Sequence, residues 1–333
     1  MGTGRLEKAL DHLCAGNIPV GIVQKPETIF YLTGFYPSSS AVLLLRAEPL
    51  LLLSQMDGPR FGEIKGVKAK VVEKFEGDLK RLGPKVGAEK GTVSLAFYEK
   101  YLKGKEVVDL DFLQRMRSVK DEREVRAIRR AIRVAEGAMG EVLESVKAGG
   151  ESERSLAARA EYLIKREAEV AFEAIVASGR NSTIPHHRPT DRRVRACDAV
   201  IVDLGARVGH YNSDMTRTHV PPTGEELYEI VLEAQEAGIK ECYAGNALKN
   251  ADLAVRRVLR EYGYEDAFLH STGHGVGLEV HEGPRLARDE KGRFEAGMVV
   301  TVEPGVYSKR FGVRIEDMVL VGPRPRVLSR FRK

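Results

Sequence analysis

The apolar and polar positions in the first third of the chain alternate between helical and strand patterns. Short apolar runs at Pro19–Val23, Ala41–Leu45 and Leu50–Leu53 predict buried strands. Only four residues separate the last two runs, which predicts a hairpin. Between the first two, Tyr31–Phe35 predicts a strand or turn with packing aromatic rings. The sequence therefore predicts a smaller α/β domain over residues 1–115, with no cluster of catalytic residue types.

A helical pattern begins near Ser118. Ser118 and Asp121 resemble a capping box, in which a hydroxyl and an acid satisfy free backbone N–H groups at a helix start. Apolar residues then recur at three- and four-residue steps until Gly149 and Gly150 end the helix. These apolar residues are Val125, Ile128, Ile132, Ala135, Met139 and Val142. A second helix is predicted over residues 152–167.

The same order of elements then occurs a second time. The predicted strands are Ala174–Ala177, Ala199–Leu204, Val299–Glu303 and Val313–Val321, and two further helices begin at Thr223 and Leu253. Each half thus has two helices followed by strands. This repetition predicts a pseudo-symmetric α+β domain over residues 116–333, with a site between its halves.

Composition excludes several classes of protein. At 333 residues, with 43% hydrophobic and 30% charged residues, the chain has the balance of a two-domain globular protein. The longest apolar run, Leu50–Leu53, is far too short for a membrane span, and the N-terminal segment does not resemble a secretory leader. Three widely spaced cysteines form no disulfide or metal pattern, which favours a reducing cytoplasm. A net charge of +5 with clustered arginines is typical of solvated surfaces, so nucleic-acid binding is disfavoured.

Two acids interrupt the apolar pattern in the first half of the second domain. Asp203 lies within the strongly apolar segment Ile201–Ala206, and Asp214 follows eleven residues later, beyond a turn predicted at Gly209. A hairpin would bring the two carboxylates side by side. Because buried like charges are unfavourable unless a cation lies between them, this pair indicates a metal ion.

Three polar residues stand in similar positions in the second half. His274 lies between two glycines, which permit close approach of backbone and ligands. Glu303 and Glu316 each interrupt an apolar β segment. For each acid taken alone, the alternatives are a cap or an ion pair with Arg217 or Arg314.

Together the four acids and the histidine form an oxygen-rich ligand set with one imidazole. Such a set suits divalent Mn²⁺ or Co²⁺, with Fe²⁺ or Zn²⁺ as alternatives. Five such side chains are enough to hold two ions about 3.5–4 Å apart. Because a pair of ions lowers the pKa of a shared water, the set indicates metal-dependent hydrolysis.

These segments resemble those of the pita-bread metallopeptidases, the family of Xaa-Pro dipeptidases (prolidases), Xaa-Pro aminopeptidases and methionine aminopeptidases. Tyr31–Phe35 is similar to the creatinase-like N-terminal domain, and Arg117–Glu122 to the start of the catalytic domain. The resemblance implies a pita-bread catalytic domain over residues 116–333, preceded by a creatinase-like domain over residues 1–115. The activity it implies is hydrolysis of Xaa-Pro peptide bonds with two metal ions.

The resemblance also implies a role for each ligand. Asp203 would bind one metal ion, and Asp214 and Glu316 would bridge both. His274 and Glu303 would complete the other site. Glu303 would also pass the proton of the attacking water to the leaving amine.

Residues outside the ligand set have implied roles in substrate binding. His281 would hydrogen-bond the substrate and stabilise the tetrahedral oxyanion, and His186 would line the pocket. The neighbouring His187 is expected at the surface. Arg285, in a loop similar to that of prolidases, would pair with the C-terminal carboxylate of a dipeptide. The alternatives are structural histidines at positions 186 and 281 and a solvated arginine at position 285.

The subgroup depends on few residues. Arg285 favours a Xaa-Pro dipeptidase, and a Xaa-Pro aminopeptidase acting on longer peptides is the alternative. Tyr307–Gly312 is short beside typical prolidases, which leaves substrate length open. A non-catalytic binding protein is disfavoured because all five ligands are kept. The resemblance implies a homodimer, in which the N-terminal domain narrows the partner's active-site entrance.

Overall fold

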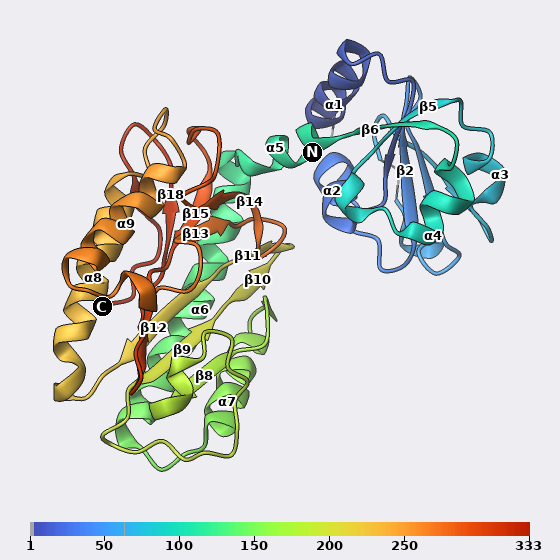
Figure 1. The fold of residues 1–333 in the computed structure, drawn as a ribbon. Helices are drawn as coiled ribbons and strands as arrows, with labels where there is room; N and C mark the ends of the chain where they lie inside the picture. Colours follow the sequence, from blue (N-terminus) through green and yellow to red (C-terminus); the bar gives the residue numbers. More distant parts are fainter. Residues whose placement is uncertain (1–2, 63) are drawn as a thin grey trace. The chain divides into compact units, whose positions relative to one another are not determined.

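The computed structural model describes residues 3–62 and 64–333. The chain divides into two compact units, Met1–Arg117 and Ser118–Lys333. The first unit has a sheet with helices beside it, and the second has a long helix packed along several sheets (Figure 1). Each unit has hydrophobic clusters of its own.

The strands of the first unit form one mixed sheet in the order β4-β3-β2-β1-β5-β6. They are Gly21–Val23 (β1), Ala41–Leu45 (β2), Leu50–Leu53 (β3), Lys68–Val71 (β4), Lys85–Ala88 (β5) and Glu106–Asp109 (β6). β2 and β3 pair antiparallel with Ala41 opposite Leu53, so the predicted hairpin is confirmed. Because both faces of β2 are buried, its sequence is a continuous apolar run rather than an alternating one.

The first unit contains helices that the sequence did not predict at specific positions. They are α1 (Thr3–Ala15), α2 (Pro26–Thr33), α3 (Glu76–Leu79) and α4 (Leu95–Phe97), and α5 (Asp111–Ser118) follows them. The prediction of a strand or turn at Tyr31–Phe35 is wrong, because its first three residues complete α2. Pro26 begins this helix, and Gly34 ends it at a φ of 77°, a left-handed conformation that glycine adopts without strain.

Four helices of 13 to 27 residues belong to the second unit. They are α6 (Glu122–Ala148), α7 (Glu153–Lys165), α8 (Glu225–Lys240) and α9 (Lys249–Glu261). The predicted start of α6 at Ser118 is wrong, because the capping box lies one turn later. The Asp121 carboxylate accepts from the backbone N–H groups of Arg123 and Glu124, and Glu124 accepts from Asp121 N. The predicted end at Gly149 is confirmed.

The strands of the second unit follow each pair of helices, so the predicted repeat is confirmed. The first set is Glu169–Val170 (β7), Ile175–Ser178 (β8), Val200–Leu204 (β9), Ala206–Val208 (β10), Tyr211–Asn212 (β11) and Met215–His219 (β12). The second set is Gly273–Gly275 (β13), Glu282–Leu286 (β14), Val299–Val302 (β15), Gly305–Tyr307 (β16), Gly312–Arg314 (β17), Asp317–Leu320 (β18) and Arg326–Val327 (β19). The sheets have the orders β12-β9-β8, β11-β10-β7, β14-β13-β15-β18-β19 and β16-β17.

The continuous strand predicted over Val313–Val321 is in fact broken. Between β17 and β18 the backbone N–H of Ile315 donates to Pro304 O, and that of Glu316 donates to Thr216 O. Ile315 still continues the pairing of β17 with the β16 segment, so the chain changes its hydrogen-bonding partner at Glu316. This break places Glu316 beside β12, a strand of the first half of the second unit.

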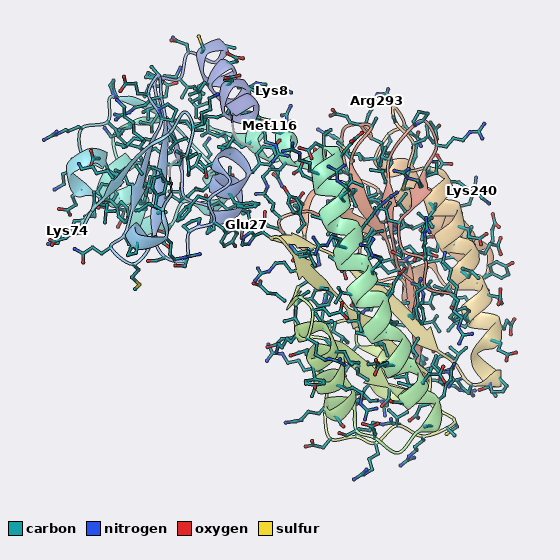
Figure 2. All side chains as sticks on the ribbon, turned by 180° about the vertical axis from the view of Figure 1, so that it is seen from behind. Lys8, Glu27, Lys74, Met116, Lys240 and Arg293 are labelled. Atoms are coloured by element: carbon teal, nitrogen blue, oxygen red, sulfur yellow. The ribbon has the colours of Figure 1, made fainter. Side chains whose placement is uncertain are left out.

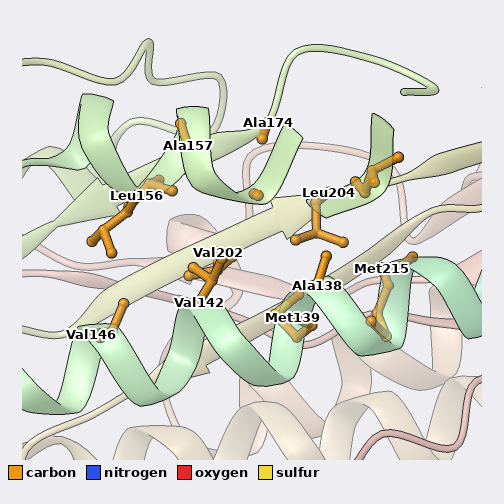
Figure 3. Close-up of a cluster of buried hydrophobic side chains, with 14 of the residues drawn as sticks. Ala138, Met139, Val142, Val146, Leu156, Ala157, Ala174, Val202, Leu204 and Met215 are labelled. Atoms are coloured by element: carbon orange, nitrogen blue, oxygen red, sulfur yellow. The ribbon is translucent and has the colours of Figure 1, made fainter. Parts of the chain in front are cut away.

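A hydrophobic cluster joins α6 and α7 to the inner face of β9 (Figure 3). Val202 and Leu204 point into this cluster, where α6 contributes Met139 and Val142. Each fully buried aliphatic side chain of this kind stabilises the fold by about 1.5–3 kcal/mol. Because side chains alternate along a strand, the intervening Asp203 points to the opposite face. The cluster thus fixes the strand whose other face carries the carboxylate.

Charged side chains such as Lys74, Lys240 and Arg293 project to solvent (Figure 2). Across the described residues, no helix has the length and apolar character that spanning a bilayer requires. Short 3₁₀ turns occupy Gly58–Arg60, Lys90–Thr92, Gly179–Thr183, Pro222–Gly224 and Glu265–Ala267, and a π-helical turn occupies Tyr98–Leu102.

Candidate metal centre

The five predicted ligands come from both halves of the second unit. Asp203 lies in β9 and Asp214 directly before β12, and these strands pair antiparallel. His274 lies in β13, Glu303 directly after β15, and Glu316 in the break between β17 and β18. Elements far apart in sequence thus deliver five polar side chains to one place.

Within this cluster, three groups of possible metal-binding atoms form, and the atoms of each group lie within 4.8 Å of one another. The groups are Asp203 with Asp214 and Glu316, His274 with Glu303 and Glu316, and Asp214 with His274 and His281. Asp214, Glu316 and His274 each belong to two groups. Of these three, only the two carboxylates have two oxygens, so Asp214 and Glu316 are the side chains suited to contact two neighbouring ions.

The carboxylates of the cluster are almost completely removed from solvent. Asp203 is 9% exposed, Asp214 4% and Glu316 2%. Burial, reinforced by neighbouring carboxylates, raises the pKa of Asp214 and Glu316 well above their usual values. Among the described residues, Asp203 Oδ1 and Glu316 Oε1 are buried acceptors without a donor. Divalent cations would satisfy both oxygens and offset the repulsion, so these residues fit a metal centre.

His274 is held with one ring nitrogen aimed at the carboxylates. Its Nδ1 lies 3.1 Å from Gly275 O, and its Nε2 lies 3.3 Å from Glu303 Oε1 and 3.6 Å from Asp214 Oδ2. A backbone carbonyl on one nitrogen leaves the other available as a metal ligand. Burial disfavours the charged ring, but Glu303 outweighs it and raises the pKa of His274 to about 9. Burial opposes ionisation of Glu303 as well, yet His274 lowers the pKa of Glu303 to about 2.

The glycines beside His274 are required by close backbone approach. A Cβ atom on Gly273 would lie 2.0 Å from Thr301 O, a distance that no side chain can tolerate. Thr301 Oγ1 in turn accepts from the backbone N–H of His274 at 3.0 Å. Gly273 therefore lets β13 pack against β15, which brings His274 to Glu303, and Gly275 lets β13 approach Gly283 of β14.

Arg314 is a buried cation next to the cluster, and sequence reasoning treated it only as an alternative ion-pair partner. Its Nη2 donates to Asp203 Oδ2 at 2.7 Å, while the other oxygen of this carboxylate has no donor. Its Nη1 donates to Tyr307 Oη at 3.0 Å and to Pro185 O at 3.1 Å. Arg314 therefore orients Asp203 without occupying both of its oxygens. In the sequence, the feature that could have identified Arg314 as part of the site is its position two residues before Glu316.

Two of the predicted substrate-binding residues lie near this cluster. The ring of His281 meets that of His274 edge to face, with centroids 4.3 Å apart. Burial, followed by the charge of His274, lowers the pKa of His281, and the charge of His186 contributes in the same direction. His186 is itself exposed. His281 and His186 thus stand close enough to interact electrostatically.

Arg285 is placed differently from the other predicted residues. It lies opposite His274 in the β13–β14 pairing, but its side chain is 55% exposed. Its guanidinium contacts Asp289 Oδ1 at 2.9 Å and Glu290 Oε2 at 3.5 Å. A substrate carboxylate would therefore have to compete with two acids of the same chain.

Comparison with known proteins accounts for this geometry. Residues 126–323 match Metallopeptidase family M24, and residues 5–119 match the Creatinase/Prolidase N-terminal domain. The chain belongs to metallopeptidase family M24. It is 34% identical over 331 residues to the Xaa-Pro dipeptidase of Pyrococcus furiosus, and the match covers 95% of this chain and 94% of that relative.

Solved structures of M24 relatives have the same fold. Prolidase from Pyrococcus horikoshii OT3 has a TM-score of 0.93 at 32% identity, with 99% of each chain covered. X-Pro aminopeptidase from Thermotoga maritima MSB8 has a TM-score of 0.85 at 30% identity, with 98% of each chain covered. The predicted pita-bread fold with a creatinase-like N-terminal domain is confirmed.

One expectation for the M24 unit is wrong: His187 does not lie at the surface. It is 9% exposed, and its Nε2 lies 2.9 Å from Glu153 Oε2. Glu153 is fully buried at the start of α7. Sequence reasoning missed it because an acid in the first turn of a helix is ordinarily a solvated dipole partner. The contacts that distinguish Glu153 come from residues 178–190, which follow α7 in the chain.

Because Glu153 is buried and ionised, we expect part of the free energy of unfolding to be lost in acid. Burial opposes its ionisation, but hydrogen bonds from Thr190, Ser178 and other groups outweigh this and lower its pKa from 4.5 to about 2. The stabilisation, at most about 3 kcal/mol, is complete above pH 4.5 and is lost as the pH falls toward 2. Urea unfolding should therefore show that Glu153→Gln is less stable than the parent at pH 7, with a gap that narrows below pH 4.5. A gap that stays constant would contradict this, and the exposed Glu167→Gln serves as the control.

Proposed function

We propose that this chain hydrolyses Xaa-Pro dipeptides with the help of two divalent metal ions. The observation that carries the proposal is the sharing of Asp214 and Glu316 between neighbouring groups of ligand atoms. Two divalent ions would balance the total negative charge of the four carboxylates of the cluster. The similarity to the Xaa-Pro dipeptidase of Pyrococcus furiosus supports the choice of substrate.

The ligand geometry supports a specific division of roles. Asp203 would hold one ion with its free Oδ1, and Asp214 and Glu316 would bridge both ions. His274 and Glu303 would complete the other position. The oxygen-rich set favours Mn²⁺ or Co²⁺ over softer ions, with Zn²⁺ and Fe²⁺ as alternatives. When bound, such ions supply Lewis acidity and lower the pKa of a coordinated water.

The remaining residues would act on the peptide itself. Glu303 would take the proton of the attacking water and deliver it to the proline nitrogen as the bond to carbon breaks. His281 would donate a hydrogen bond to the carbonyl oxygen, where negative charge develops. His186 would line the pocket for the substrate.

A direct test compares a Xaa-Pro dipeptide with a Xaa-Pro-Xaa tripeptide in the presence of Mn²⁺ or Co²⁺. Metal-dependent cleavage of the dipeptide alone is the expected result, and a Xaa-Ala dipeptide is the control. Cleavage of the tripeptide would instead establish the Xaa-Pro aminopeptidase alternative. If neither peptide is cleaved while metal is bound, the substrate assignment is wrong.

Arg285→Ala tests the proposed contact with the substrate carboxylate. Because a charge-assisted hydrogen bond contributes about 1.5–3 kcal/mol and this arginine is exposed, we expect KM for the dipeptide to rise about 10-fold. The value of kcat should change little, since the carboxylate is not the reacting group. Steady-state kinetics beside Arg288→Ala, an exposed arginine of the same segment, checks this. An unchanged KM would remove Arg285 from the binding site.

We also propose that residues 1–115 act as the N-terminal domain and residues 116–333 as the catalytic domain of a cytoplasmic homodimer. The division into compact units after Arg117 supports these boundaries. The three cysteines are free, which suits a reducing compartment. Sedimentation or light scattering would decide between monomer and dimer.

A further inference from the structure

The carboxylate of Glu153 is surrounded by donors from one segment, residues 178–190. Its Oε1 accepts from the backbone N–H and the hydroxyl of Ser178, both at 2.7 Å, and from Asn181 Nδ2 at 2.9 Å. Its Oε2 accepts from the backbone N–H of Thr190 at 3.1 Å and its hydroxyl at 2.7 Å, and lies 2.9 Å from His187 Nε2. The segment therefore wraps around one buried negative charge.

A second attachment holds the same segment beside the metal-binding cluster. Arg314 Nη1 donates to Pro185 O at 3.1 Å. Ser182 Oγ accepts from Gly312 N at 2.9 Å, which ties the segment to β17. His186 lies between Pro185 and His187, so both of its chain neighbours are fixed by buried charged groups. The ring of His186 is exposed and is therefore available to a ligand.

We propose that Glu153 is a positioning residue that holds His186 in place for contact with the peptide substrate. This inference rests on the proposed function, because the contact of His186 with substrate belongs to it. A loop otherwise loses its geometry through backbone freedom, and displacement of a substrate-positioning group by about 1 Å can lower rates about 100-fold. Glu153 does not touch the substrate, and it acts through His187, Thr190 and Ser178.

Glu153→Gln probes this role with little change in shape. The amide has one acceptor oxygen in place of two, and its NH₂ group would face the donors of Thr190 or Ser178. We expect kcat/KM for the Xaa-Pro dipeptide to fall about 10–100-fold, mainly through KM. His186→Ala should produce a loss of similar size. The matched control is Glu167→Gln, an exposed acid just beyond α7, which should leave the kinetics unchanged.

The combination of both substitutions separates positioning from general stability. If Glu153 acts through His186, the double variant should be no worse than His186→Ala alone. Fully multiplicative losses, or an unchanged KM with kcat reduced in proportion to the folded fraction, would overturn the inference. If Glu153→Gln does not fold, Thr190→Val replaces it, since this removes one donor to Oε2. Its expected loss is about 3–10-fold, again absent in the His186→Ala background.

A readout independent of activity keeps this inference distinct from the proposed function. If the parent protein cleaves no Xaa-Pro peptide, the proposed function fails by itself. Histidine NMR then decides the structural inference: in Glu153→Gln the His186 ring resonances should shift or broaden, while those of His12 in the first unit stay unchanged. An unchanged His186 signal would overturn the positioning role.

Discussion

Replacing Asp214 by Asn is expected to remove metal binding and peptide hydrolysis together. Asp214 belongs to two of the three groups of ligand atoms, so its loss weakens both positions for an ion. Residues that only orient a metal-binding side chain already contribute about 10–100-fold to metal affinity or activity. A shared ligand should contribute more, and we expect kcat/KM to fall by more than about 100-fold. Glu316→Gln should behave alike for the same reason.

The same substitution should make the metal-free protein more stable. Asp214 is buried, and burial together with Asp203 raises its pKa far above that of an unfolded chain. A carboxyl of this kind disfavours folding when it ionises above its unfolded pKa, and Asn carries no such charge. We therefore expect Asp214→Asn to raise Tm without metal by about 2–4 °C for each kcal/mol of repulsion removed.

Thermal unfolding and metal titration on the same samples check both effects. Mn²⁺ should raise Tm of the parent protein, because an ion that binds only the folded state stabilises it. Asp214→Asn should show no such rise. Asp191→Asn, at an exposed surface pair with Arg154, is the matched control and should keep both binding and turnover. Metal-dependent turnover at the parental rate in Asp214→Asn would refute its assignment as a ligand.

Arg217→Met is expected to cost the largest amount of stability. This guanidinium is 2% exposed and donates to Asp317 Oδ1 at 2.8 Å, a carboxylate that is itself fully buried. Its other acceptors are the backbone carbonyls of Thr216, Glu316, Phe331 and Arg332. Removing one partner of a buried ion pair costs about 3–5 kcal/mol. We expect the lower end, because Lys333 Nζ still contacts Asp317 Oδ2 at 2.9 Å.

Chemical denaturation of two further variants tests the origin of this loss. Arg217→Met with Asp317→Asn should recover part of the stability, because no buried carboxylate is then left without its arginine. Arg207→Met removes a partly exposed arginine paired with the exposed Glu169, and should cost less than about 1 kcal/mol. Equal losses in Arg207→Met and Arg217→Met would show that burial of the pair is not what matters.

The sequence was most informative where one polar residue interrupts an apolar run. Asp203 stood out because β9 is otherwise apolar, and Glu316 stood out for the same reason. The preference of glycine and serine for helix ends also predicted the end of α6 at Gly149 and the start of α7 at Ser152. These features depend on neighbours within a few residues, which is why the pattern alone was sufficient.

The missed features depend on contacts between distant segments. The break after β17 arises from a hydrogen bond to Thr216, about one hundred residues earlier, so periodicity could not reveal it. His187 looked like a surface residue because its partner Glu153 lies 34 positions away. The roles of the five ligands remain predictions, although the structure brings all five together.

The acceptors of Arg217 have a consequence for biosynthesis. Phe331 and Arg332 are translated more than one hundred residues after this arginine, yet their carbonyl groups complete its hydrogen bonds. A nascent chain lacking them leaves a buried guanidinium only partly satisfied within β12, the strand that directly follows Asp214. The sheet of the first unit is complete at residue 109, and all of its strands come from residues 21–109. We therefore expect the first unit to fold on the ribosome, whereas the second unit reaches its final form only after residue 332 has left the exit tunnel.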